Sequence, residues 1–242
     1  MLYNEPDLLL RDELREPRLY AATVRAIAEG HHQLSDIARA SGIGAPSTVS
    51  GYLDLLRSLR WVERRVPVGP TRRRRQWGTW HLVDPYIRFW ARYVLPHTRR
   101  LEYGEADELL YELIRPTWAQ FVGPVWEEVA RGHLSLLSQG RELPFWPEEI
   151  GSWWSAQAQI DLVGVNYARR LAVLGEARWR EAKVGRRDLV ELQTKARLWL
   201  ADESGWELFY VLYSKGGFTD ELRSLARQDR RLLLKTPAEV VR

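Results

Sequence analysis

Apolar side chains recur at helical spacing in three stretches of the first 60 residues. The first, residues 18–29, is followed by Gly30, a residue that commonly ends a helix. The second, around Ile37, is broken at residues 41–42, and the third opens with Pro46, which the first turn of a helix tolerates. The pattern predicts three helices with a tight turn in the middle, a helix-turn-helix. The apolar positions are Leu19, Val24, Ile27 and Ala28, then Leu34, Ile37 and Ala38, then Val49, Tyr52, Leu53, Leu56 and Leu59.

Two stretches with strand-like patterning come next, at residues 61–68 and 77–83. Gly69 and Pro70 lie between them and favour a turn. A helix-turn-helix followed by a hairpin predicts a winged helix-turn-helix domain over residues 1–83.

The rest of the chain predicts a helical connector and then an α/β domain. Residues 84–115 form the connector, and a dense aromatic face along residues 86–95 is interpreted as packing. After Gly140 strand patterns alternate with helix patterns, which predicts a mixed sheet flanked by helices over residues 116–242. The expected fold class is therefore a two-domain α+β/α/β arrangement. The predicted strands are residues 143–150, 153–165, 171–179, 206–213 and 231–234, and the predicted helices are residues 101–114, 116–137, 187–200 and 219–228.

Composition narrows the class of protein. The chain has 242 residues, 45% of them hydrophobic, which supports buried cores and excludes dominant disorder. It has no cysteine, so disulfides, cysteine-ligated zinc and a thiol nucleophile are excluded. There is no long apolar run and no secretory pattern at the start, so we expect a cytoplasmic protein without membrane contact. The five histidines lack zinc-hydrolase spacing, and the serine-hydrolase and Rossmann glycine motifs do not occur.

Positive charge is concentrated in the first part of the chain. Residues 1–100 hold 17 arginines and 10 acidic residues, a net charge of +7, whereas the remainder carries −3. Four consecutive arginines lie at the predicted hairpin tip and repel one another unless a polyanion neutralises them, so double-stranded DNA is the expected partner. A solvated loop, or a wing docked on an acidic protein surface, is the alternative. The expected DNA-contacting residues are Arg72, Arg73, Arg74 and Arg75, with Ser47, Thr48 and Ser50 at the start of the third helix as phosphate contacts.

A predicted hairpin in the second half brings two acids together. If residues 166–171 form its loop, Val163 lies opposite Leu174, and Asp161 lies opposite Glu176 on the same face. Two carboxylates about 5 Å apart repel unless a cation lies between them, and such oxygen ligands suit Mg²⁺ or Mn²⁺.

At these residues the chain resembles the PD-(D/E)XK, restriction-endonuclease-like superfamily. Asp161 followed by Glu176-Ala177-Arg178 is similar to its Asp…Glu-x-Lys core, in which the acids bind Mg²⁺ and the lysine orients or activates water. The resemblance implies a third acid on the preceding helix, Glu127 with Glu128 as second choice. Arginine at the lysine position cannot act as a base near neutral pH, although it can stabilise negative charge on a phosphate. An alternative takes Glu181-Ala182-Lys183 as the Glu-x-Lys element, which requires a bulge or a different register because odd-numbered residues face away from Glu176. With Glu176 preferred, Lys183 is the candidate for a migrated amine.

The order of these modules is similar to the C-terminal half of archaeal-type AAA ATPases. That family carries a P-loop ATPase module before the winged helix, but the P-loop motif does not occur in this sequence, so no ATP site is expected here. We therefore expect either a fragment or a stand-alone relative that works beside a separate ATPase. Two functions remain open: a Mg²⁺-dependent DNA nuclease, and a catalytically inactive nuclease-fold protein that binds DNA or docks a partner ATPase.

Overall fold

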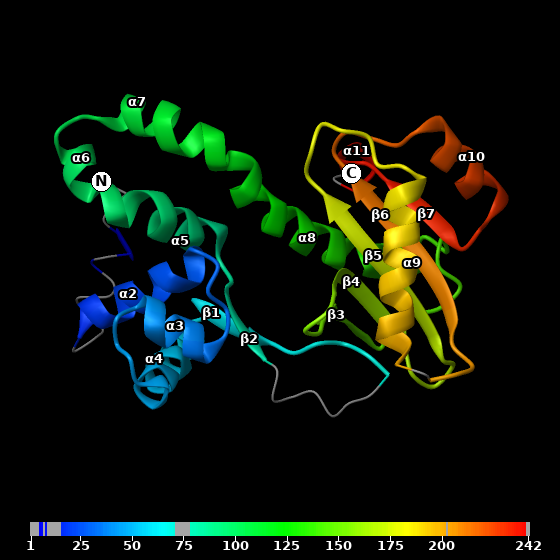
Figure 1. Ribbon diagram of the computed structural model, residues 1–242, viewed down its shortest axis with the longest axis horizontal. Coiled ribbons are helices and arrows are strands. Elements are labelled where there is room, and N and C mark those ends of the chain that lie inside the picture. Colours follow the sequence, from blue (N-terminus) through cyan, green and yellow to red (C-terminus); the bar gives the residue numbers. More distant parts are fainter. Residues whose placement is uncertain (1–4, 7, 9–15, 71–77, 202, 241–242) are drawn as a thin grey trace. The chain divides into compact units, whose positions relative to one another are not determined.

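The computed structural model describes residues 5, 6, 8, 16–70, 78–201 and 203–240. The chain divides into two compact units (Figure 1). The N-terminal unit comprises Met1–Arg65 and Gly78–Thr117, and the C-terminal unit comprises Val66–Trp77 and Trp118–Arg242.

Three helices form most of the core of the N-terminal unit: α2 (Pro17–Ala28), α3 (Leu34–Ala40) and α4 (Pro46–Ser58). The three predicted helices are thus present. Gly30, with φ of +101°, turns the chain after α2, and a proline occupies the first turn of both α2 and α4. Their apolar stripes meet in one buried cluster that includes Val24, Ile37, Leu53 and Leu56.

A two-stranded antiparallel sheet follows the helices and is shorter than predicted. Strand β1 (Val62–Arg65) pairs with β2 (Thr79–Leu82), from Val62 opposite Leu82 to Arg65 opposite Thr79. The prediction of a strand through residue 68 was wrong, because the chain joins the C-terminal unit at Val66. There Val68 is buried and its carbonyl accepts a hydrogen bond from Trp199 Nε1 at 2.9 Å. The predicted arginine tip, residues 72–75, lies outside the described residues.

The helical connector is more broken than predicted. Asp84 accepts a hydrogen bond from the Tyr86 backbone and begins α5, whose continuation buries Trp90 and Tyr93, as the packing interpretation requires. Gly104, with φ of +86°, interrupts the predicted helix over residues 101–114. The elements are α5 (Pro85–Phe89), a π-helical turn (Trp90–Val94), a 3₁₀ turn (Leu95–His97), α6 (Thr98–Glu102), α7 (Ala106–Leu109), a second π-helical turn (Leu110–Ile114) and the long α8 (Arg115–Gln139).

The C-terminal unit contains a five-stranded mixed sheet in the order β3-β4-β5-β6-β7. The pairs β3–β4 and β4–β5 are antiparallel, and β5–β6 and β6–β7 are parallel. The prediction of a mixed α/β sheet is confirmed, but the predicted strand over residues 143–150 was wrong except at its last two residues, which begin β3. The elements are β3 (Glu149–Trp154), β4 (Gln159–Asn166), β5 (Leu171–Arg178), α9 (Arg186–Leu200), β6 (Glu207–Ser214), α10 (Asp220–Gln228), β7 (Leu232–Lys235) and α11 (Pro237–Val240).

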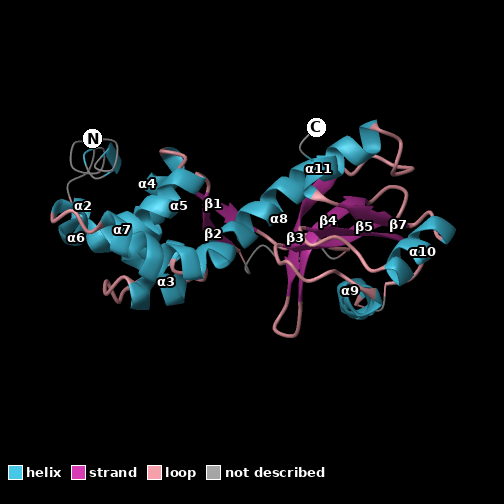
Figure 2. Cartoon of the chain, turned by 90° about the horizontal axis from the view of Figure 1, so that it is seen from above, coloured by secondary structure: helices cyan, strands magenta, loops and turns pink. Residues whose placement is uncertain are grey.

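Helices α8 and α9 cover opposite faces of this sheet (Figure 2). Successive residues of β5 point to alternate faces, so Leu174 packs with the α9 residues Leu192 and Trp199, whereas Val173 packs with Leu134 of α8. Strands β4 and β5 are almost fully buried, so a charged residue on either strand needs a partner within the protein.

Candidate functional site

The acidic pair lies where β4 and β5 separate. The predicted register is present, with Val165 opposite Ala172 and Val163 opposite Leu174. The paired region ends at Leu162 opposite Gly175, one position before Asp161 and Glu176. Both acids are buried, with 6% and 2% of their surfaces exposed.

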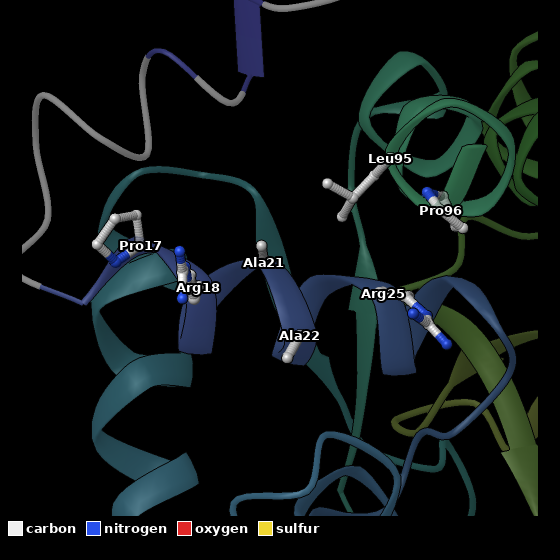
Figure 3. Close-up of a pocket in the computed structure, with 7 residues that line it drawn as sticks. All are labelled: Pro17, Arg18, Ala21, Ala22, Arg25, Leu95 and Pro96. Carbon is white, nitrogen blue, oxygen red and sulfur yellow. The ribbon is translucent and has the colours of Figure 1, made fainter. Parts of the chain in front are cut away.

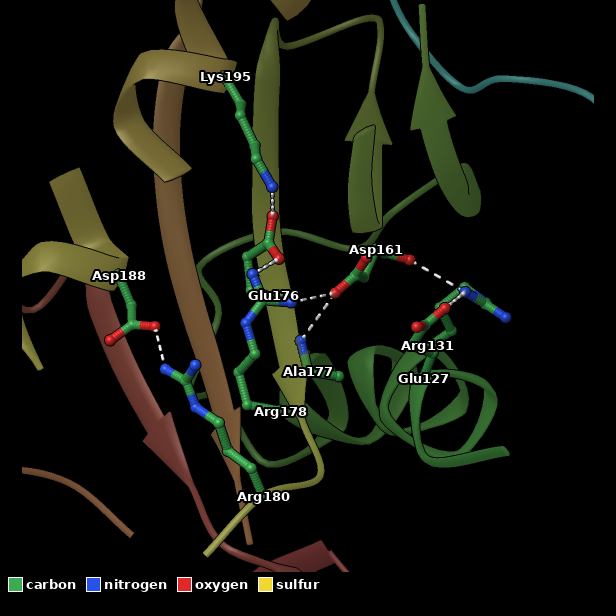
Figure 4. Close-up of polar contacts among 9 residues, drawn as sticks. All are labelled: Glu127, Arg131, Asp161, Glu176, Ala177, Arg178, Arg180, Asp188 and Lys195. Carbon is green, nitrogen blue, oxygen red and sulfur yellow. Dashed lines mark hydrogen bonds and ion pairs between the residues drawn. The ribbon is translucent and has the colours of Figure 1, made fainter. Parts of the chain in front are cut away.

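Arg178 bridges these two carboxylates (Figure 4). Its Nη2 lies 2.6 Å from Glu176 Oε2, and its Nη1 donates a hydrogen bond to Asp161 Oδ2 at 3.4 Å. Asp161 Oδ2 also accepts the backbone N–H of Ala177 at 3.2 Å. Because Arg178 is two residues beyond Glu176 on the same strand, its side chain leaves the same face of the sheet, as the sequence predicted.

A second cation reaches Glu176 from helix α9. Lys195 Nζ donates to Glu176 Oε1 at 2.6 Å, so each oxygen of this buried carboxylate lies against a positive charge. Lys195 is not among the residues that the sequence predicted for the site. A sequence pattern that could have identified it is its position on the apolar stripe of a helix, three residues after Leu192 and four before Trp199. Residues at this spacing share one helix face, and here that face points toward the sheet.

Helix α8 supplies a third acid and a third cation. Arg131 Nη1 donates to the Asp161 backbone carbonyl at 3.0 Å and lies 3.9 Å from Glu127 Oε2. Burial raises the pKa of the Glu127 carboxyl to about 7, and the Asp161 carboxylate adds to the shift. Burial likewise raises the pKa of Glu176 to about 7, with Asp161 again contributing, although the two cationic neighbours of Glu176 act in the opposite direction.

The oxygen donors have the chemistry of a Mg²⁺ site, but their arrangement does not fit one. Arg178 occupies the place between the two carboxylates, and Lys195 takes the other oxygen of Glu176. Within the described part of the chain, no three side chains of ligand type gather closely enough to hold a metal ion. Three acidic and three basic side chains gather at this site. The three acids are Asp161, Glu176 and Glu127, and the three cations are Arg178, Lys195 and Arg131.

Other predicted site residues make no described contact with this cluster. Lys183 is exposed, and none of its described contacts reaches Glu176. Ser47 and Thr48 are exposed in the first turn of α4, and Ser50 is partly exposed one turn later.

A pocket in the N-terminal unit lies against α2 (Figure 3). Its walls are small or apolar apart from two arginines, and Arg25 is paired with Glu29 at 2.8 Å. The lining contains no carboxylate, hydroxyl or imidazole, so these residues offer neither acid–base chemistry nor metal ligands. The lining residues are Pro17, Arg18, Ala21, Ala22, Arg25, Leu95 and Pro96.

One family and one curated protein are similar to the chain. Residues 90–191 match the family model DUF234, described as "Archaea bacterial proteins of unknown function". That stretch contains Glu127, Asp161, Glu176 and Arg178, but ends before Lys195. An uncharacterized protein of Methanocaldococcus jannaschii, MJECL04, is 31% identical over 218 residues, which is 88% of this chain and 48% of the relative. The chain thus spans about half the length of that curated relative. No solved structure matches the chain.

None of the described helices is both long enough and apolar enough to cross a lipid bilayer.

Proposed function

We propose that the chain is a DNA-binding protein in which a winged helix-turn-helix unit is followed by a PD-(D/E)XK-like unit that does not cleave DNA. The observation that carries this proposal is the ion-paired state of the acidic pair, in which Arg178 contacts both carboxylates and Lys195 contacts one of them.

Arginine at position 178 argues against hydrolysis. Its guanidinium stays protonated near neutral pH, so it cannot accept a proton from water. It also keeps the acids from acting as free ligands, because a buried carboxylate that loses its cationic partner is strongly destabilised. The nuclease-like unit is then a scaffold, and DNA affinity comes from basic and polar groups outside the acidic pair.

The N-terminal unit supplies the support for DNA binding. Ser47 and Thr48 are exposed in the first turn of α4, where their hydroxyls can donate hydrogen bonds to phosphate oxygens. Farther along α4, Arg57 is paired with Asp54 at 3.1 Å, so this helix offers little net charge for reading base edges. The arginine run 72–75 falls in the connection between β1 and β2. We therefore propose binding through the DNA backbone, with weak sequence preference.

A second candidate function is Mg²⁺-dependent phosphodiester hydrolysis. It is favoured by a third carboxyl, Glu127 on α8, because Arg131 contacts both this carboxyl and the backbone carbonyl of Asp161. Under this function Asp161→Asn abolishes cleavage of DNA in Mg²⁺ or Mn²⁺.

An ATPase partner is the remaining part of the proposal. It rests on the similarity of module order to archaeal-type AAA ATPases and on a relative about twice as long as this chain. Co-purification of the chain with an ATPase module would support it, and a chain that shows no association with such a module contradicts it.

Replacing Arg72, Arg73, Arg74 and Arg75 with alanine tests DNA binding. We expect the affinity for a duplex to fall and the slope of log K against log salt to decrease by about 0.9 for each phosphate that the variant no longer neutralises. Fluorescence anisotropy across a salt series measures both. A matched control removes four exposed arginines elsewhere, Arg39, Arg186, Arg187 and Arg231, and with them the same charge. Equal slopes for the wild type and the tip variant would contradict the proposal.

A further inference from the structure

We infer that Arg178 is a built-in substitute for a divalent cation, and that removing its charge opens a metal site formed by Asp161 and Glu176. This inference rests on the proposed non-cleaving role of the C-terminal unit. It explains how two buried acids can lie together in that unit without a metal.

The position of the guanidinium supports this assignment. Both carboxylates are buried, and two buried negative charges on adjacent strands need positive charge between them. Arg178 is the side chain that contacts both, at 2.6 Å from Glu176 and 3.4 Å from Asp161. Its planar fork spans two separate carboxylates, which the compact amine of a lysine does with difficulty. The Arg178 side chain is 30% exposed, so the space that it fills opens to solvent.

Glu176 has an oxygen that is suited to a metal. Its Oε2 is buried and has no hydrogen-bond donor, although Arg178 Nη2 lies 2.6 Å away. The contact is therefore one of charge without the alignment of a hydrogen bond. A cation with no directional requirement satisfies such an oxygen better than a misaligned N–H does.

Removal of Arg178 leaves negative charge on the two carboxylates that a divalent cation can neutralise. Asp161 and Glu176 would then share the single ammonium of Lys195, which remains on the other oxygen of Glu176. Oxygen ligands with excess negative charge, partly open to water, are typical of Mg²⁺ and Mn²⁺ sites.

Arg178→Gln in the full chain tests the inference, with Mn²⁺ as the probe. We expect the variant to bind one Mn²⁺ per chain at least about tenfold more tightly than the wild type, measured by loss of the free Mn²⁺ signal in electron paramagnetic resonance. Mn²⁺ should also raise the melting temperature of the variant and leave that of the wild type nearly unchanged. Arg180→Gln is the matched control, because Arg180 is paired with Asp188 at 2.7 Å and contacts neither acid. Adding Glu176→Gln to Arg178→Gln should abolish the new binding.

Two results would overturn the inference: an Arg178→Gln variant that binds Mn²⁺ no better than the wild type, or new binding that persists when Glu176→Gln is added. If Arg178→Gln does not fold, Arg178→Met replaces it, since that variant also removes the charge; we expect it to bind Mn²⁺ more tightly than the wild type, and affinity equal to that of the wild type contradicts the inference. The arginine-tip test of DNA binding uses no metal. A failure of DNA binding therefore remains distinct from a failure here.

Discussion

Arg178 determines how the acidic pair behaves. In the nuclease-like superfamily that this chain resembles, a lysine occupies this position, and its charge lies at one point at the end of a flexible side chain. Here a guanidinium lies between two buried carboxylates, and the amine comes instead from Lys195 on α9. The register of β4 and β5 made the proximity of Asp161 and Glu176 predictable. Lys195 was not predictable in the same way, because its contact depends on how α9 lies on the sheet and not on local spacing.

Lys195 and Glu176 should be energetically coupled. Lys195→Met leaves one oxygen of a buried carboxylate without its cation, so we expect a loss of about 1–3 kcal/mol in the free energy of unfolding. Glu176→Gln removes the charge that Lys195 neutralises. The double variant should therefore lose less than the sum of the two single losses, by about 0.5–3 kcal/mol. Urea unfolding of the wild type and the three variants measures this, and strictly additive losses would show that the contact contributes nothing.

At the scale of elements, strand β5 is placed by close backbone approach as well as by apolar burial. A Cβ added at Gly175 would lie 2.8 Å from the Val211 carbonyl oxygen of β6 and 2.7 Å from its side chain. These strands pair in parallel at that position, so a side chain there would push β5 away from β6 next to Glu176.

The sequence predicted β5 and β6 well because both are long apolar runs. It failed for residues 66–68, whose apolar pattern fits a hairpin strand equally well, and only tertiary packing against Trp199 decides between the two.

Two glycine substitutions should change stability in opposite directions. Gly175→Ala should lower the free energy of unfolding by about 1–3 kcal/mol, because backbone would have to move. Gly132→Ala in α8 should raise it by up to about 1 kcal/mol, because nothing lies within 4 Å of the new methyl group and alanine favours a helix. Chemical denaturation of both variants checks the pair. A Gly175→Ala protein as stable as the wild type would contradict the packing described for β5.

At the scale of the whole molecule, the uneven distribution of charge along the chain corresponds to different roles of its two parts in our proposal. The first 100 residues carry a net charge of +7, and in our proposal that charge serves DNA binding. The −3 of the remainder includes acids that are balanced within the protein at the Asp161–Glu176 pair. The three N-terminal helices and the mixed sheet with its flanking helices were predictable from periodicity. The boundaries were less so: residues 66–77 belong to the C-terminal unit, and α8 begins in the N-terminal unit, which no local pattern reveals.

Duplex DNA binding in the presence of EDTA and of Mg²⁺ tests the central claim most directly. A chain whose acids are neutralised by its own arginine and lysine should bind DNA in EDTA at least as tightly as in Mg²⁺, which competes for the phosphates as a counterion, and should leave the duplex intact in both conditions. Fluorescence anisotropy gives the affinity, and gel electrophoresis of the same samples shows whether the DNA is cut. Binding that requires Mg²⁺, or cleavage that Asp161→Asn abolishes, would contradict the account and favour the metal-dependent phosphodiesterase.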